Sequence, residues 1–331
     1  MALTQDIQAS DIESQNRLRR MSRAWIGDSV FRGLTLAFTL VVLLVLGGVV
    51  IVLIDGASPA LHLLGLDFLT STSWNPVTER YGALVPLVGT VATAAIALIV
   101  GVPCAFAVAF FLTELCPHRI RAPLSIAVEL LAAIPSIIYG IWGLFVAAPY
   151  FQNTLEPTLA SWLGPIPIIG QLFSGPPIGI GLLLAGLVLA IMILPYITAV
   201  IRDIFESVPA VLRESAYGLG ATRWEVVWSV VLPYSRTGVV GAIMLGLGRA
   251  LGETMAVTFV IGNAHRLPKS LFDPTTTISA TLANEFNEAV SDIYTSSLIG
   301  LGLVLFVLTF TVLAFGKKLL LNNAHTKGGR K

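Results

Sequence analysis

Residues 213–236 read RESAYGLGATRWEVVWSVVLPYSR, and this stretch between two long apolar runs carries the most specific pattern in the chain. A glycine such as Gly220 lets the backbone bend where a Cβ would clash, and Pro233 cannot continue a helix. We therefore expect a short helix with Glu214 near its positive N-terminal end. A glycine turn should follow it, and then an amphipathic helix over 222–232 that Pro233 ends.

The composition is that of a membrane protein. Of the 331 residues, 55% are hydrophobic and 12% are charged, and the mean hydropathy is +0.84. Soluble domains carry about 25% charged residues. The net charge of +1 argues against a nucleic-acid-binding protein, which needs a basic surface. The two cysteines provide no disulfide framework, and we expect both to be free thiols.

Six apolar stretches are long enough to cross a membrane, since a span needs about 20 mostly apolar residues. Pro103 and Pro135 fall inside the second and third, which predicts a kink or tilt in one and accommodation by neighbouring helices in the other. The expected fold is an all-α membrane protein of six transmembrane helices, with a segment 1–30 before the transmembrane domain 31–318 and a tail 319–331. The expected spans are 31–54, 84–112, 124–148, 178–201, 237–262 and 294–316.

The distribution of basic residues predicts the direction of the spans. Of the 20 lysines and arginines, 16 lie in the N-terminal segment through Arg32, in the segments 113–123 and 202–236, or after the last span. The opposite side has Arg80, Arg266 and Lys269. Basic residues concentrate in cytoplasmic segments of membrane proteins. We therefore expect both termini to be cytoplasmic.

No pattern in the sequence is typical of covalent chemistry. There is no G-x-x-x-x-G-K-[ST], so the chain is not expected to bind ATP through a P-loop. There is no nucleophile elbow and no H-E-x-x-H, and the four histidines lack partners at metal-ligand spacing. We expect a protein that is not an enzyme and binds no metal or cofactor itself.

The stretch 213–236 resembles the loop of ABC importer permeases, which runs Glu-Ala-Ala, three residues, Gly, nine residues, Ile-x-Leu-Pro. Ser215 and Val230 replace its Ala and Ile. The resemblance implies a type I ABC importer permease in which the segment 202–236 rests in a groove of an ATPase subunit and transmits its motion. The alternative is an amphipathic loop helix on the membrane surface. The matching positions are Glu214, Ala216, Gly220, Leu232 and Pro233.

Longer stretches, ELLAAIPSIIYGIWG (129–143) and GRALGETMAVTFVIGN (248–263), resemble the PstC-type permeases of phosphate-specific ABC importers. So does STSWNP ahead of GALVPLVGTV, and the similarity covers residues 30–318. It implies alternating access in a prokaryotic cytoplasmic (inner) membrane. It also implies a PstA-like second permease, two copies of an ATP-binding subunit that uses ATP and Mg, and an external phosphate-binding protein that docks on 55–83 and 263–293.

The residues themselves leave alternatives open. The solute could be another oxyanion, such as sulfate, molybdate or phosphonate, because selectivity would reside largely in the external binding protein. A second copy of this chain could replace the PstA-like partner. A self-sufficient secondary anion transporter is a further alternative, although such folds often have internal repeats and we find none.

Arg249 and Glu253 place two charges in the fifth apolar stretch, one helical turn or about 6 Å apart. A central Arg costs at least about 2.5–3.5 kcal/mol on insertion scales. One interpretation is an ion pair on one helix face that fixes the span. The other, which we favour, is an anion path, because the planar fork of Arg donors fits phosphate oxygens. Glu253 would balance the charge and Thr254 would add a hydroxyl; the resemblance implies the same role for the Arg and Glu.

Glu129 is a third charge within an apolar stretch, about five residues inside the cytoplasmic end of the third predicted span. A carboxylate at this depth can reach the interface and pair there. We favour a structural partner for an arginine of the cytoplasmic side. The alternative is an inner gate on the transport path.

Overall fold

The computed structural model describes residues 2–167 and 169–328, with side chains for 30–167 and 169–318. The chain divides into two compact units, Met1–Asp55 and Gly56–Lys331. The first unit is a single helix, which continues into the second unit as far as Leu64. Residues 329–331 of the predicted tail lie outside the described residues.

Helices make up almost all of the regular structure. Elements labelled η are π-helical turns, and β1 and β2 form one small antiparallel hairpin in which Trp74 pairs with Tyr81. The elements are α1 (Ala2–Leu64), α2 (Asp67–Thr70), β1 (Trp74–Asn75), β2 (Arg80–Tyr81), α3 (Leu84–Phe110), η1 (Phe111–Leu115), α4 (His118–Ala132), α5 (Ser136–Trp142), η2 (Gly143–Ala147), α6 (Ala148–Tyr150), η3 (Phe151–Leu155), α7 (Glu156–Leu163), α8 (Ile169–Leu172), α9 (Leu182–Glu206), α10 (Ala210–Gly218), α11 (Arg223–Val226), η4 (Val227–Val231), α12 (Leu232–Leu251), α13 (Met255–Val260), α14 (Ile278–Glu285) and α15 (Asp292–Gly328).

Five helices of the described chain are long and apolar enough to cross a membrane, and a bent pair of helices brings the number to six if it counts as one span. Each of the six predicted spans overlaps one of them. The five are Val30–Leu64, Leu84–Leu115, Leu182–Glu206, Arg223–Leu251 and Asp292–Lys318; the bent pair is His118–Ala132 with Ser136–Leu163.

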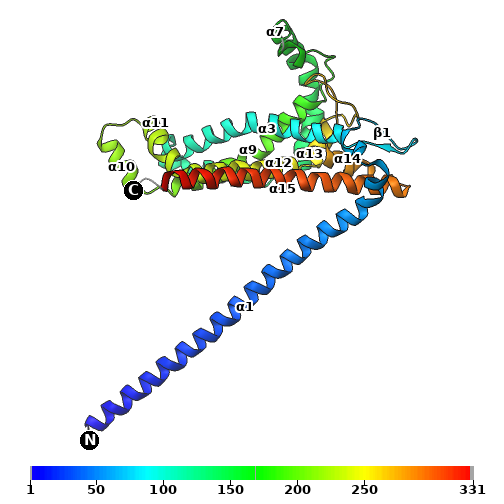
Figure 1. Ribbon diagram of the computed structural model, residues 1–331. Helices are drawn as coiled ribbons and strands as arrows, with labels where there is room; N and C mark the ends of the chain where they lie inside the picture. Colours follow the sequence, from blue (N-terminus) through cyan, green and yellow to red (C-terminus); the bar gives the residue numbers. More distant parts are fainter. Residues whose placement is uncertain (1, 168, 329–331) are drawn as a thin grey trace. The chain divides into compact units, whose positions relative to one another are not determined.

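The centre of the second unit is α9, which packs against α3, α4 and α12. Ile193, Ile197 and Ile201 follow one another at four-residue intervals and are fully buried, as expected for one face of a helix. Figure 1 shows α3, α9, α12 and α15 lying roughly along a common axis, with α12 running opposite to the other three. One end of this bundle carries α10 and α11, the loop end; the other carries β1, β2 and α14, the hairpin end.

Two of the predicted spans are interrupted. The third bends by 85° where α4 gives way to α5, because Pro135 adopts an extended backbone (ψ 135°) ahead of α5 and cannot donate the hydrogen bond that a continuous helix needs. The expectation of a continuous fifth span over 237–262 was wrong: α12 ends at Leu251 and α13 begins at Met255.

Pro233 does not end the helix ahead of it, so that prediction was also wrong. The chain stays helical from Arg223 to Leu251. A proline ring clashes with the carbonyl four residues earlier and donates no hydrogen bond. The π-helical turn η4 immediately precedes Leu232, whose N–H reaches back to the Val227 carbonyl. This wider turn provides the room that Pro233 needs.

Close backbone contact holds the hairpin end to α3. Ile278 donates its N–H to the Thr90 hydroxyl at 3.0 Å. A threonine caps the helix there: the Thr277 hydroxyl accepts the Ala280 N–H at 3.2 Å. A Cβ on Gly89 would lie 2.0 Å from the Thr276 carbonyl oxygen, so only glycine fits at this position.

We expect Gly89→Ala to lower the thermal unfolding midpoint of the purified chain in detergent. The new methyl group must displace backbone, and overpacking of this kind costs about 1–3 kcal/mol or more. Gly241→Ala is the matched control, because nothing lies within 4 Å of a Cβ at Gly241. Equal midpoints for the two variants would contradict the close contact.

Candidate functional site at the interrupted helices

Arg249 lies in the last turn of α12, and its side chain is exposed. Its Cζ atom lies 5.7 Å from the centre of the Tyr196 ring on α9, within cation–π range. A cation near the C-terminus of a helix is also favoured by the helix dipole. The guanidinium therefore lies at the surface of this chain, two residues before α12 ends.

Glu253 lies in the interruption and not on a helix with Arg249. Its carboxylate accepts the Ala256 N–H at 3.2 Å, at the start of α13. Among the ion pairs of the described side chains, none joins Arg249 to Glu253. The interpretation of Arg249 and Glu253 as an ion pair on one helix face, which we did not favour, was therefore wrong, because a carboxylate that caps a new helix start competes with continuation of the old helix.

Thr254 stands at the junction between Glu253 and α13. Its backbone (φ −112°, ψ −67°) is that of the residue before the helix, and its hydroxyl donates to the Gly252 carbonyl at 3.4 Å. Non-helical backbone at membrane depth is tolerated where it is buried in protein or lines a water-filled cavity. The three predicted path residues therefore occur together, around a gap in the helix.

The interruption in the third span meets the one in the fifth. The Tyr139 hydroxyl on α5 donates to the Leu131 carbonyl on α4 at 2.9 Å and so bridges the bend. A Cβ on Gly140 would lie 3.0 Å from the Ala256 Cα of α13. Tyr139 is also within electrostatic range of Arg249. The half-helices α5 and α13 thus pack closely beside the Arg249 site.

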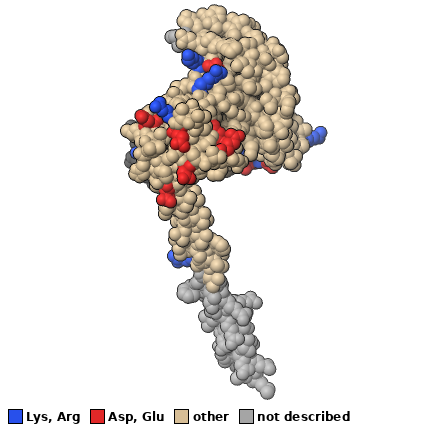
Figure 2. All heavy atoms as spheres, turned by 90° about the vertical axis from the view of Figure 1, so that its right-hand side faces the viewer, with Lys and Arg blue, Asp and Glu red and all other residues tan. Residues whose placement is uncertain are grey.

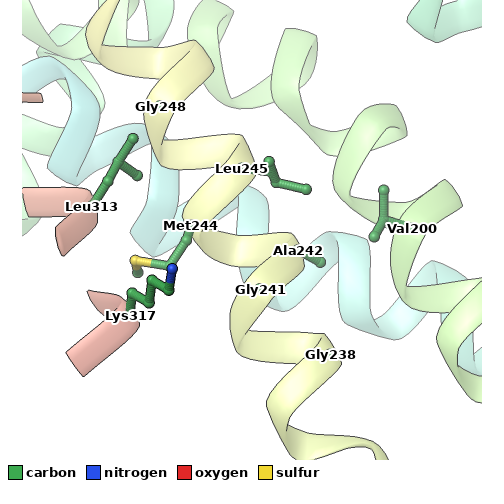
Figure 3. A pocket seen from close by; sticks show the side chains of 9 residues that line it. All are labelled: Val200, Gly238, Gly241, Ala242, Met244, Leu245, Gly248, Leu313 and Lys317. Carbon is green, nitrogen blue, oxygen red and sulfur yellow. The ribbon is translucent and has the colours of Figure 1, made fainter. Parts of the chain in front are cut away.

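A shallow apolar groove runs along α12 from Gly238 to Gly248 (Figure 3). Its volume is about 490 Å³. Small residues of α12 form its floor, α9 contributes Val200, and α15 contributes Leu313 and Lys317. Because side chains at helical spacing share a face, Arg249 continues the line of Ala242 and Leu245.

The loop end contains the helix–turn–helix that the sequence predicts. α10 ends at Gly218, Gly220 takes a left-handed backbone (φ +86°), and Thr222 forms a capping box with Glu225 at the start of α11. Glu214 lies in the middle of α10 and not at its N-terminal end as expected. That expectation was wrong because the helix begins directly after Pro209, whose fixed φ suits a helix start.

Glu114, at the end of the second span, anchors this loop. Its carboxylate lies 2.9 Å from Arg213, and the two side chains are 6% and 19% exposed. The Tyr217 hydroxyl donates to the same carboxylate at 3.3 Å, and Arg223 donates to the Glu114 carbonyl at 3.1 Å. The sequence analysis missed this network; a lone acid ending an apolar run, opposite an arginine-rich loop, was the available signal.

Glu129 pairs with an arginine, as the favoured interpretation requires. Its carboxylate lies 2.8 Å from Arg202 of α9, and Arg202 also contacts Asp203 at 2.7 Å. The Arg202 side chain is mostly buried, while Glu129 is exposed. The contact joins α4 to α9 toward the loop end; a gating role for Glu129 stays a hypothesis.

Chains of similar fold occur in solved structures of ABC transporters. A bacterial alginate ABC transporter in complex with its pentasaccharide-bound periplasmic protein matches with a TM-score of 0.54 at 17% identity, over 84% of this chain and 92% of that one. The MetNI methionine ABC transporter matches with a TM-score of 0.51 at 18% identity, over 72% and 94%. These matches establish the fold.

Sequence comparison identifies the family. Residues 101–322 match the model of the binding-protein-dependent transport system inner membrane component. The phosphate transport system permease protein PstC of Mesorhizobium japonicum is 60% identical over 294 residues, 89% of this chain and 90% of that one. The chain belongs to the PstC family. The PstC protein of Pasteurella multocida is 56% identical, over 92% and 94% of the two chains.

A second polar cluster of this PstC-family chain lies at the hairpin end, around Glu285. The Glu285 carboxylate accepts hydrogen bonds from Trp74 at 2.6 Å and Tyr294 at 2.8 Å. It also contacts His265 at 2.6 Å, whose ring stacks on that of Trp74. The cluster ties the hairpin to α14 and α15, and the sequence analysis did not find it, because Trp74 lies 211 positions before Glu285 in the chain.

Charge at the hairpin end is mainly acidic. Asp67, Glu79 and Glu288 are exposed there, and Figure 2 shows acidic groups over the face seen from this end. Burial alone would raise the pKa of Glu285, but hydrogen bonds from His265, Tyr294 and Trp74 and the charge of His265 outweigh burial and lower the pKa.

The lowered pKa predicts a pH effect. A carboxylate whose pKa falls on folding stabilises the protein above its ordinary pKa of 4.5 and loses that contribution as the pH falls through the lowered value. We expect Glu285→Gln to lower the thermal midpoint at pH 7, with the difference from the native chain shrinking below about pH 4.5. Glu288→Gln, at an exposed acid, is the control. A difference that stays constant with pH would contradict the assignment.

Proposed function

We propose that this chain is a membrane-spanning permease subunit of an ATP-driven importer of inorganic phosphate, and that it forms the translocation path by alternating access. The observation that carries the proposal is an exposed arginine at an interrupted helix, in a chain 60% identical to a protein named as a phosphate transport permease. A charge held at this depth marks a substrate or ion path by default.

Arg249, Glu253 and Thr254 form the centre of the proposed path. The guanidinium offers a planar set of donors to phosphate oxygens. Glu253 lies in the gap between α12 and α13, and its negative charge reduces the positive potential around Arg249. Phosphate is therefore not bound too tightly to be released. Glu253 also accepts a hydrogen bond from the protonated anion. Because no contact joins Glu253 to Arg249, all the donors of Arg249 stay available to the anion.

A second permease completes the path. Arg249 is exposed on this chain, yet an arginine in the middle of a span faces protein or water and not lipid. The small residues of the neighbouring groove, among them Gly241 and Gly248, suit close approach of another helix. The likeness to PstC proteins favours a PstA-like partner over a second copy of this chain.

The segment 202–236 couples the path to two copies of an ATP-binding subunit, which binds ATP and Mg. Glu214, Ala216 and Gly220 shape its exposed helix and turn, and Leu232 and Pro233 begin α12, which continues to Arg249. Movement of the loop is therefore passed along one helix to the path. Leu219 and Val211 are strongly exposed and suit an apolar groove.

The membrane arrangement follows from these roles. The proposed domains are a cytoplasmic segment 1–30, the permease domain 31–318 and a cytoplasmic tail, in a prokaryotic cytoplasmic (inner) membrane. With both termini inside, the loop end meets the ATP-binding subunits. The external loops 55–83 and 263–293 then receive the phosphate-binding protein.

Phosphate uptake by the reconstituted complex tests the proposal. Proteoliposomes holding the complete complex, with loaded binding protein, should accumulate labelled phosphate only when ATP is supplied. Sulfate and molybdate should not compete. Uptake without ATP would favour a secondary transporter, and uptake of sulfate in place of phosphate would leave only an ABC permease for a different oxyanion.

A further inference from the structure

Tyr196 is the one residue in the described part of the chain whose side chain holds the Arg249 guanidinium. The contact runs through the face of the ring. A guanidinium has five N–H donors in its own plane, and a cation–π contact uses none of them. A carboxylate partner would instead occupy donors and cancel the charge that an anion needs.

The ring is well placed to act as a fixed support. Tyr196 belongs to α9, the most buried of the candidate spans, and its neighbours Pro195 and Ile197 are both buried. Arg249, by contrast, is exposed at the end of α12, and a free arginine side chain samples many rotamers. Contact with a rigid ring reduces the entropy lost when phosphate binds.

We propose that Tyr196 is a positioning residue for phosphate translocation, which acts by holding the Arg249 guanidinium with its ring face while all five donors stay free for the anion. This inference rests on the proposed function. It assigns to α9, which the sequence analysis left outside the path, a direct role in the orientation of Arg249. The ring carries the effect and the hydroxyl does not.

Two substitutions at Tyr196 distinguish the contribution of the aromatic ring from that of the hydroxyl. In the reconstituted complex, Tyr196→Leu removes the aromatic face, and we expect about a fivefold to tenfold fall in phosphate transported per ATP hydrolysed, the range of a partly desolvated cation–π contact. Tyr196→Phe keeps the face and should stay within about twofold of the native complex. Tyr150→Leu, which removes an exposed tyrosine of α6, is the control.

The outcomes decide the proposal. Transport by Tyr196→Leu equal to the native level overturns it, and so does an equal loss in Tyr196→Phe, which would assign the effect to the hydroxyl. If the leucine variant fails to assemble, Tyr196→Met replaces it, because the flexible methionine fills irregular space. A native complex that transports no phosphate contradicts the proposed function; a native complex that does, with an equally active leucine variant, contradicts only this inference.

Discussion

Arg249→Gln should lower ATP-dependent phosphate transport by at least about tenfold while the complex still assembles. A hydrogen bond to a charged group is worth about 1.5–3 kcal/mol, and 1.4 kcal/mol is a factor of ten. Glutamine keeps much of the length and polarity but loses the charge and the fork of donors. Because Arg249 is exposed and makes no ion pair within the described chain, the substitution leaves no buried partner unpaired.

Two control variants test whether the loss of transport is specific to the guanidinium of Arg249. Arg249→Lys keeps the charge without the fork and should retain an intermediate rate, since lysine binds phosphate as a point charge. Arg119→Gln removes an exposed arginine at the start of α4 and should transport at the native rate. Undiminished transport by Arg249→Gln would mean that the charge is structural and that the path runs elsewhere.

Arg213→Met should uncouple the loop end from the membrane helices. It leaves Glu114, only 6% exposed, without its positive partner, and breaking a buried ion pair in this way costs about 3–5 kcal/mol. We expect α10 to lose its fixed position against η1. The measurement is retention of the ATP-binding subunit during purification, together with ATP hydrolysis stimulated by loaded binding protein; both should fall severalfold.

The double variant Glu114→Gln/Arg213→Met identifies the cause. Removal of both charges leaves no unpaired buried ion, so retention of the ATP-binding subunit should recover in part. Arg119→Met serves as the surface control. If Arg213→Met retains the ATP-binding subunit as the native chain does, the Glu114 network does not hold the loop.

The loop end was the part of the fold most open to sequence reasoning. A left-handed residue in a tight turn is usually glycine, and Gly220 (φ +86°) is such a residue. Long apolar stretches likewise predicted the regions of the spans, because hydropathy averages over about 20 residues. The exact ends of the helices were harder to predict from the sequence. The π-helical turn η4 lets the helix continue past Pro233, and nothing in the hydropathy pattern indicates such a turn.

The interruption in the fifth predicted span could not be predicted from the sequence for a related reason. The gap over 252–254 is too short to lower the hydropathy of its window, and it depends on Glu253 as a cap for α13 and on the packing of α5 against α13. The Glu114 and Glu285 clusters join residues about 100 to 200 positions apart, a relation that only the folded chain displays. Sequence reasoning therefore singled out Arg249, Glu253 and Thr254 for a proposed path, but it did not predict the gap between α12 and α13 in which Glu253 lies.

Thiol accessibility at Thr254 tests the central claim most directly. Cys104 and Cys116, both free as expected, would be replaced by serine and Thr254 by cysteine. In membrane vesicles holding the complete complex, a membrane-impermeant reagent should modify this cysteine from one side without nucleotide, and from the other side when the ATP-binding subunits are trapped with ATP. Modification from one side alone in both states, or from neither side, would contradict a path that runs past the interruption by alternating access.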